Sequence, residues 1–218
     1  MINKDIKYVL FDLDGTLTDP FEGITNSVAY SLKSYGIEVA DKKELACFIG
    51  PPLYESFEKY YGFSKEEAIK AVEKYREYFS VTGLFENEVY PCAEELLREI
   101  KNSGLKVVLA TSKPEVFAKR ILDHFGLSGY FDEIVGSLLS GERVKKGDVI
   151  KEALYRLRAP EKKSLVMVGD RHHDVIGAKE NGIISIGVLY GYGSKEELTD
   201  AGADYIAENI EELKEILL

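Results

Sequence analysis

The sequence of 218 residues predicts an α/β fold: a Rossmann-like, doubly wound parallel sheet with an α-helical region inserted after its first strand. Three features lead to this prediction. Short, nearly continuous apolar runs are typical of strands that are buried on both faces of a sheet. Helix-like stretches separate most of these runs. Residues 20–82 contain helical patterns but no apolar run of this kind.

The apolar runs, which we expect to form the sheet, lie at residues 7–11, 105–110, 132–137, 164–169 and 183–188. None shows the alternation of apolar and polar residues that marks a strand with one face in water. Strands of this type are usually parallel, because the helices that connect parallel strands cover both faces of the sheet.

Helical patterns with recognisable ends connect the expected strands. The stretch 92–104 ends at Gly104, and the stretch 114–126 starts at Pro114 and ends at Gly126. A third stretch, 147–158, precedes the run at 164–169. The alternation of strand and helix supports the parallel sheet.

The inserted region shows helical spacing in four stretches, at residues 23–36, 42–48, 52–62 and 64–79. We predict that residues 1–18 and 83–218 form the core with the sheet, and that residues 19–82 form a separate helical domain.

Composition excludes several classes of function. The formal charge of −10 disfavours binding to nucleic-acid polymers or anionic lipid surfaces, and no concentrated basic patch offsets it. The two cysteines lack the spacing of a zinc site or a disulfide framework. The N-terminus lacks the apolar region of a signal peptide, and no apolar run is long enough to span a membrane. We therefore expect a soluble, cytoplasmic protein.

Polar residues follow three of the expected strands. In an open parallel sheet, ligands bind at the carboxyl ends of the strands, so these residues should lie together. They comprise Asp12-Leu13-Asp14-Gly15-Thr16 after the first run, Thr111-Ser112-Lys113-Pro114 after the second, and Gly169-Asp170-Arg171-His172-His173-Asp174 after the fourth. Each alone could be a turn or a helix N-cap, but the combination of acids, hydroxyls and lysine at one edge indicates a site.

These segments resemble the four motifs of the haloacid dehalogenase-like phosphohydrolases: D-x-D-G-T, a strand-end Thr or Ser, a lysine, and G-D-x-x-x-D, in this order along the whole chain. The resemblance implies that residues 19–82 form that family's helical cap. Two further segments, "FIGPPLYESF" and the sequence from Gly169 to Ser194, look like the branch of phosphoglycolate phosphatases and 5'-nucleotidases.

The residues also suggest a chemistry. A phosphomonoester dianion repels an attacking carboxylate, and Mg²⁺ with oxygen ligands would cancel that charge. We expect Mg²⁺ to be held by Asp12, Asp170 and a backbone carbonyl near Asp14, with Asp174 supporting the site. Asp12 would attack phosphorus and form an aspartyl-phosphate. Asp14 would protonate the leaving group and then activate water.

The remaining expected site residues bind the phosphoryl group or the substrate. Thr111 and Ser112 can donate hydrogen bonds to the transferring oxygens. Lys146 is expected to balance the charge, with Lys145 as the alternative. Gly50, in a rigid Gly-Pro-Pro turn of the helical region, is a candidate for substrate contact.

Other motifs carry less information. The segment 136–143 has the glycine spacing of a phosphate-binding P-loop but lacks its Lys-Ser/Thr pair, and "GYG" at 191–193 is too short for a dinucleotide-binding fingerprint. His172 and His173 could contact substrate or simply line the loop. Asp19 is interpreted as a turn residue.

The sequence therefore predicts an enzyme that hydrolyses small phosphorylated metabolites, such as phosphoglycolate or nucleoside 5'-monophosphates, as a monomer or weak dimer. A phosphomutase, which returns the phosphoryl group to a sugar, and a non-catalytic phospho-receiver remain alternatives. Carbon–halogen cleavage is disfavoured, because halide leaves without the proton that Asp14 would supply.

Overall fold

The computed structural model of the chain describes residues 5–158 and 161–218. Contacts within the chain divide it into two units. The sheet unit contains the chain up to Asp19 together with Val89–Leu218, and the helical unit contains Pro20–Glu88. The role of residues 19–82 as a cap, with the boundaries predicted above, stays a prediction.

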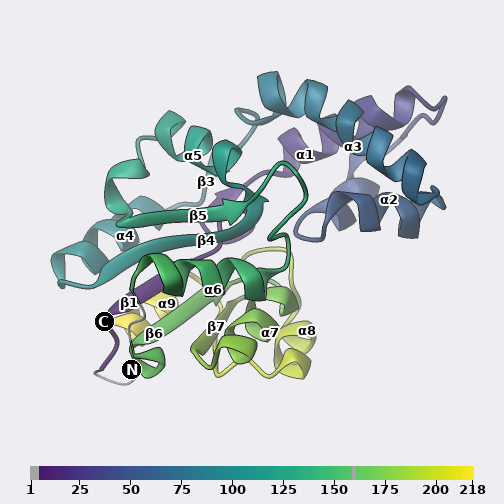
Figure 1. Cartoon of the computed structure of the whole chain (residues 1–218). Coiled ribbons are helices and arrows are strands. Elements are labelled where there is room, and N and C mark those ends of the chain that lie inside the picture. The colour runs from purple at the N-terminus through teal and green to yellow at the C-terminus, as the bar shows by residue number, and fades with distance from the viewer. Residues whose placement is uncertain (1–4, 159–160) are drawn as a thin grey trace. The chain divides into compact units, whose positions relative to one another are not determined.

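Six strands form the sheet of the sheet unit (Figure 1). They lie in the order β5-β4-β1-β6-β7-β8, and each neighbouring pair is parallel. Their bounds are β1 Tyr8–Phe11, β4 Lys106–Pro114, β5 Glu133–Ser137, β6 Leu165–Gly169, β7 Ile184–Val188 and β8 Tyr205–Ala207. The predicted parallel α/β fold is confirmed, and the sequence located all of these strands except β8.

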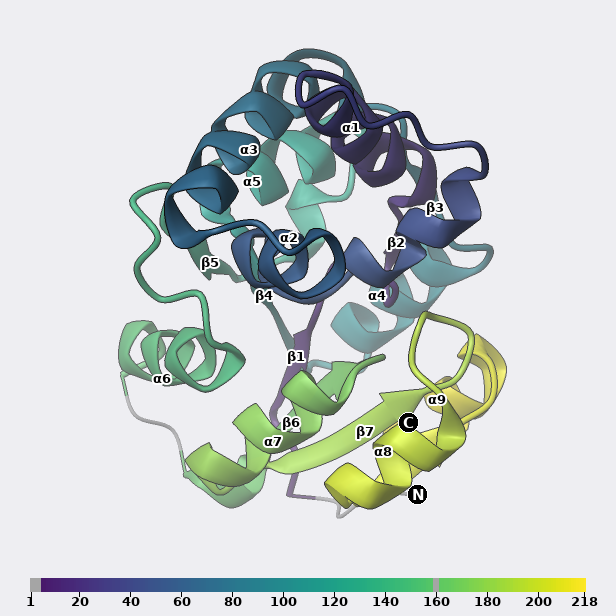
Figure 2. The same cartoon turned by 90° about the vertical axis from the view of Figure 1, so that its right-hand side faces the viewer.

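The helices of the sheet unit lie on both faces of the sheet. Figure 2 shows α6 and α7 on one side and α4 and α9 on the other. The helical elements are α4 Ala93–Asn102, α5 Glu115–His124, η3 Ser128–Tyr130, α6 Lys146–Arg156, η4 Lys162–Ser164, α7 His172–Asn181, α8 Lys195–Ala201 and α9 Ile210–Leu217. Within the described part of the chain, no helix combines the length and the apolar character that a membrane span requires.

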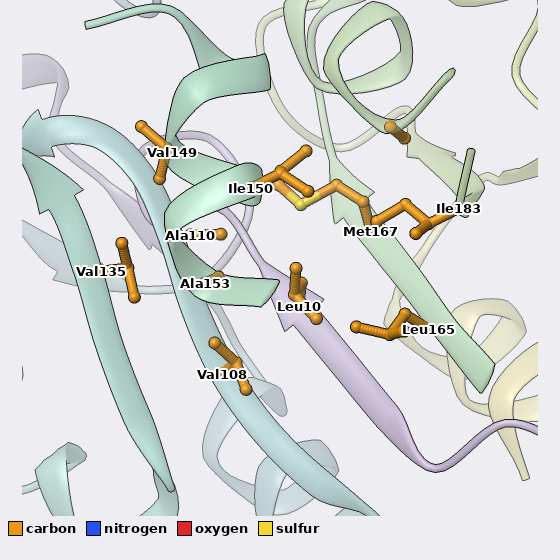
Figure 3. Packing of buried hydrophobic residues seen from close by; sticks show 11 residues of the cluster. Leu10, Val108, Ala110, Val135, Val149, Ile150, Ala153, Leu165, Met167 and Ile183 are labelled. Atoms are coloured by element: carbon orange, nitrogen blue, oxygen red, sulfur yellow. The ribbon is translucent and has the colours of Figure 1, made fainter. Parts of the chain in front are cut away.

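Apolar side chains fill the space between the sheet and the α6–α7 layer (Figure 3). Leu10 of β1 lies in this cluster between Val108 of β4 and Met167 of β6, and all three are fully buried. Ile150 of α6 covers them. Burial of these side chains fixes the sheet, and with it the positions of the strand ends.

The direction in which the chain adds strands to the sheet reverses at β1. From β1 the sheet extends outward through β4 to β5, after which the chain returns past β1 to β6. Ligands of doubly wound sheets bind outside the carboxyl ends of the strands at such a reversal. The residues that follow β1, β4 and β6 are thereby brought to one place.

The helical unit consists of α1 Phe21–Lys33, η1 Lys42–Phe48, α2 Leu53–Tyr61, α3 Lys65–Tyr78 and the π-helical turn η2 Phe79–Gly83. Gly62 ends α2 in the left-handed conformation, and Ser64 with Glu67 forms a capping box that starts α3. Two short strands, β2 Thr18–Asp19 and β3 Glu88–Val89, pair with each other where the chain passes between the units.

Candidate active site

Asp12 is the first residue beyond β1 and is fixed at the edge of the sheet. Its backbone N–H donates to the Val168 carbonyl of β6 at 2.9 Å. The side chain is largely buried, and its Oδ1 accepts a hydrogen bond of 2.8 Å from the Leu13 N–H. Gly15 then turns the chain with a φ of +80°, a conformation that favours glycine.

Lys146, the first residue of α6, reaches the end of β1 with its ammonium group. Its Nζ lies 2.8 Å from Asp12 Oδ1 and 2.8 Å from Asp174 Oδ1, and it donates to the Ala110 carbonyl at 3.0 Å. Burial lowers the pKa of Lys146, but Asp12 and Asp174 outweigh burial and raise it overall, so the ammonium stays charged. Lys145, the alternative considered from the sequence, is exposed.

Three buried carboxylates converge beside this lysine. Asp12, Asp170 and Asp174 each offer an oxygen within 4.8 Å of the others. Burial, followed by the charges of Asp174 and Asp12, raises the pKa of Asp170 well above its ordinary value. The pKa of Asp174 is raised to about 6, again chiefly by burial. The single ammonium group of Lys146 therefore compensates the negative charge of the three carboxylates only in part.

A hard divalent cation fits this cluster. Oxygen atoms are the ligands that Mg²⁺ prefers, and buried carboxylates with raised pKa values become stable as anions when a cation binds. Asp170 Oδ1 is buried and has no hydrogen-bond partner within residues 5–158 and 161–218. A buried oxygen without a partner is costly unless an ion or water satisfies it. The identity of the ion stays a prediction.

Asp14 has a different environment from the other acids. Its Oδ2 lies 2.7 Å from the ammonium of Lys113, which is itself almost fully buried. Burial raises the pKa of the Asp14 carboxyl, and Lys113 opposes this rise. The sequence placed Lys113 at the strand end but did not predict this ion pair.

The segment that carries Lys113 departs from regular strand pairing. β4 pairs with β5 through Ala110 and again at Pro114, with a shift of register between them. Such an irregularity re-aims side chains near sites. Thr111 is buried, and its Oγ1 accepts a hydrogen bond of 3.2 Å from the Lys113 N–H. Ser112 is partly exposed.

The site carries excess negative charge. When ionised, its four carboxylates face two ammonium groups, so two negative charges remain: the acids are Asp12, Asp14, Asp170 and Asp174, and the bases are Lys113 and Lys146. A phosphomonoester dianion would meet net repulsion, and a bound divalent cation would remove it.

Asp19 is not a simple turn residue. It ends β2, and its carboxylate accepts a hydrogen bond from the hydroxyl of Tyr192, which follows β7. The backbone N–H of Tyr192 donates to Asp170 Oδ2 at 2.8 Å. The bond between Tyr192 and Asp19 could not be predicted from the sequence, because the two residues are 173 positions apart.

His172 is engaged in a structural contact at the start of α7. Glu197 Oε1 of α8 lies 2.6 Å from His172 Nδ1 and also accepts from the His172 N–H and from Arg171 Nε, each at 2.9 Å. Burial works against ionisation of Glu197, but these donors outweigh it and lower its pKa to about 2. The His173 ring lies against the His172 ring, with 3.9 Å between ring centroids and an angle of 39° between their planes. These contacts favour the structural interpretation of His172.

Gly50 belongs to the helical unit. It follows η1 with a φ of +102°, directly before Pro51 and Pro52. Its predicted contact with substrate stays a prediction.

Comparisons with known proteins show to which family the chain belongs. The family model described as "Haloacid dehalogenase-like hydrolase" matches residues 9–188. The chain is 44% identical over 209 residues to a 5'-nucleotidase of Pseudomonas aeruginosa, covering 96% of this chain and 94% of that protein. It is 27% identical over 225 residues to a phosphoglycolate phosphatase of Vibrio parahaemolyticus, covering 100% and 98%.

Two further proteins are similar to most of this chain. A protein of Mycobacterium tuberculosis named tyrosine-protein kinase PtkA is 40% identical over 212 residues, covering 96% of this chain and 72% of that protein. The crystal structure of a predicted phosphatase from Clostridium acetobutylicum has a TM-score of 0.93 and 52% identity, covering 96% and 97% of the two chains. The chain belongs to the haloacid dehalogenase-like hydrolase family.

Proposed function

We propose that this protein is a Mg²⁺-dependent phosphatase that hydrolyses small phosphomonoesters through an aspartyl-phosphate on Asp12. The observation that carries the proposal is the arrangement around Asp12: a buried lysine fixes one of its oxygens, two further buried carboxylates lie beside it, and a second acid follows two residues later. Each part has a separate use in phosphoryl transfer.

Asp12 is the proposed nucleophile. Lys146 and the Leu13 N–H both contact Oδ1, so Oδ2 is the oxygen proposed to attack phosphorus. Holding one oxygen orients the carboxylate for an in-line displacement without a search over rotamers. The alcohol is released in this step, and water then hydrolyses the phosphorylated Asp12.

The cation proposed at Asp12, Asp170 and Asp174, together with a backbone carbonyl near Asp14, would neutralise the phosphoryl charge and orient its oxygens. Lys146 holds Asp12 and Asp174 in place by ion pairs to both. Thr111 and Ser112 are proposed to donate hydrogen bonds to the phosphoryl oxygens.

Asp14 is the proposed acid and base. An alkoxide leaving group needs a proton, and the burial that raises the pKa of Asp14 favours the protonated form that can supply it. After the alcohol departs, the Asp14 carboxylate can take a proton from the attacking water. Lys113, 2.7 Å away, stabilises that carboxylate form. One residue thus serves both half-reactions.

The substrate class is inferred from the relatives. Proteins named 5'-nucleotidase and phosphoglycolate phosphatase match nearly the full chain, with the higher identity to the former. We therefore propose nucleoside 5'-monophosphates as the first class to test and phosphoglycolate as the second. Gly50 and its neighbours in the helical unit are the proposed contacts with the leaving group.

Phosphoryl transfer to tyrosine is a second candidate, because a relative with 40% identity is named a tyrosine-protein kinase. A phosphorylated Asp12 could pass its phosphoryl group to a phenol instead of water. Hydrolysis is favoured, because the 5'-nucleotidase has the higher identity, 44%, and is covered over 94% of its length, against 72% for the kinase.

A panel of phosphorylated metabolites tests the proposal, with kcat/KM measured as phosphate release in the presence of Mg²⁺. We expect turnover of nucleoside 5'-monophosphates or phosphoglycolate, and its loss in Asp12→Asn. Isomerisation of a sugar phosphate without phosphate release would indicate a phosphomutase. Stable phosphorylation by acetyl phosphate without turnover would indicate a receiver, and labelling of tyrosine from ATP would indicate a kinase.

A further inference from the structure

The loop that follows β7, residues 189–194, packs closely against Asp170. At two of its positions, Gly191 and Gly193, there is no room for a side chain. We call it the GYG loop. A Cβ atom added to Gly191 would lie 2.2 Å from the Gly15 carbonyl oxygen and 2.6 Å from Asp170 Oδ2. A Cβ atom added to Gly193 would lie 1.9 Å from the Asp170 carbonyl oxygen. Neither glycine has a positive φ, so close approach is what requires them.

The GYG loop also holds one oxygen of the Asp170 carboxylate. The Tyr192 N–H, between the two glycines, donates to Asp170 Oδ2 at 2.8 Å. Oδ1 of the same carboxylate is buried and lacks a hydrogen-bond partner in the described part of the chain. A carboxylate that is fixed through one oxygen presents the other in a defined direction.

Gly15, in the segment that follows β1, also lies close to the Asp170 carboxylate. A Cβ atom added to Gly15 would lie 2.2 Å from Asp170 Oδ2 and 2.9 Å from Oδ1. The carboxylate therefore lies between Gly15 and Gly191, from two loops that are far apart in sequence. Rotation of the Asp170 side chain would bring it against backbone on either side.

Side-chain contacts fasten the GYG loop to the segment after β1. The Tyr192 hydroxyl donates to Asp19, and the Tyr190 hydroxyl donates to the Thr16 carbonyl at 3.1 Å. The Tyr190 ring also meets the Tyr90 ring edge-on, with 5.3 Å between centroids. These contacts keep the two glycines pressed onto Asp170.

We propose that the GYG loop is the positioning element of the metal site, with Gly191 and Tyr192 as positioning residues that aim Asp170 Oδ1 at the cation. The inference rests on the proposed function in one respect, namely that Asp12, Asp170 and Asp174 bind a divalent cation. Groups that orient metal ligands typically contribute about 10- to 100-fold to metal affinity. The Gly-Tyr-Gly motif at residues 191–193, which is too short for dinucleotide recognition, would thus serve to orient a metal ligand.

Mn²⁺ binding tests the inference without relying on catalysis. The dissociation constant is measured from the electron paramagnetic resonance signal of free Mn²⁺, for the wild-type protein, Asp170→Asn and Gly191→Ala. We expect Gly191→Ala to raise the dissociation constant about tenfold or more. Higher Mg²⁺ should restore most of its phosphatase activity, which a general loss of folding would not permit. Gly129→Ala is the matched control, because a Cβ atom there meets nothing within 4 Å.

Each result decides the inference. Wild-type Mn²⁺ affinity in a folded Gly191→Ala protein would overturn the role of the GYG loop and leave the proposed metal site intact. No Mn²⁺ binding by the wild-type protein, or undiminished binding by Asp170→Asn, would overturn the metal site and the inference together. If Gly191→Ala does not fold, Tyr192→Phe is measured instead, because it removes only the hydrogen bond to Asp19. This variant should raise the Mn²⁺ dissociation constant about threefold. An unchanged dissociation constant would overturn the inference.

Discussion

Replacing Lys146 by methionine tests the electrostatics of the site most sharply. Methionine is unbranched and apolar, so it largely keeps the packing of the lysine stem and removes the ammonium. Lys146 Nζ lies 2.8 Å from both Asp12 and Asp174, and its side chain is 3% exposed. Removing one partner of a buried ion pair typically costs about 3–5 kcal/mol, because the remaining charge is left uncompensated.

That cost predicts a fall in thermal midpoint. In a protein of this size, 1 kcal/mol shifts Tm by about 2–4 °C, so we expect metal-free Lys146→Met to melt about 10 °C below the wild-type protein. The fall in Tm caused by Lys146→Met should be greater at pH 8 than at pH 5. Without the ammonium, the pKa of Asp174 rises further above its unfolded value, and an acid with a raised pKa loses stability as pH rises through that pKa.

Differential scanning calorimetry in EDTA measures the effect, and phosphate release in Mg²⁺ measures the catalytic role. Lys145→Met is the matched control, because Lys145 is the neighbouring residue and is exposed. Its Tm and activity should remain near the wild-type values. Equal stability and equal activity of the two variants would refute the proposed role of Lys146 and the electrostatic account of the site.

The acid role of Asp14, the proposed cation site and the buried core can each be tested separately. Asp14→Asn should slow single-turnover cleavage of an alkyl phosphate by about 10²-fold or more, but slow cleavage of p-nitrophenyl phosphate much less, because p-nitrophenolate leaves without a proton; equal losses would contradict the acid role. Mg²⁺ should raise Tm more at pH 7.5 than at pH 5, because the folded pKa of Asp174, about 6, lies above the unfolded value and protons compete with the cation below it. Tm is compared with and without Mg²⁺ at each pH, because burial lowers the pKa of His173 to about 4, and this group affects the pH dependence of stability in the direction opposite to Asp174. An equal gain in Tm from Mg²⁺ at both pH values would contradict the assignment of Asp174 to the cation site. Leu10→Ala should cost about 3–5 kcal/mol by urea denaturation, because Leu10 is fully buried at the centre of the sheet, whereas Tyr155→Ala, 78% exposed, should cost under about 0.5 kcal/mol.

Most of the sheet could be predicted because its central strands are buried on both faces. β6 is entirely apolar over Leu165–Val168, and a continuous apolar run of this length is typical of a strand that is buried on both faces. β8 escaped prediction because it has three residues at the edge of the sheet and only Ala207 is buried. The helix α7 was not singled out, since its first turn consists of site residues and its apolar positions are few.

The site was predictable as far as topology determines it. Parallel strands share one edge, so acids that follow β1 and β6 must meet, and the structure brings Asp12, Asp170 and Asp174 together. Side-chain pairing within the site was not predictable. The partner of Asp14 depends on an irregularity in β4, and the partner of Asp19 depends on the path of the GYG loop. Neither leaves a periodic pattern in the sequence.

The central claim is that Asp12 carries the phosphoryl group during turnover. Quenching the enzyme during turnover of a good substrate and reducing it with borohydride converts an aspartyl-phosphate to homoserine, which peptide mass spectrometry locates. We predict homoserine at position 12, absent when substrate is omitted. Homoserine at any other position, or none at all in samples that release phosphate at the full rate and retain an acyl-phosphate standard through the same treatment, would contradict the account.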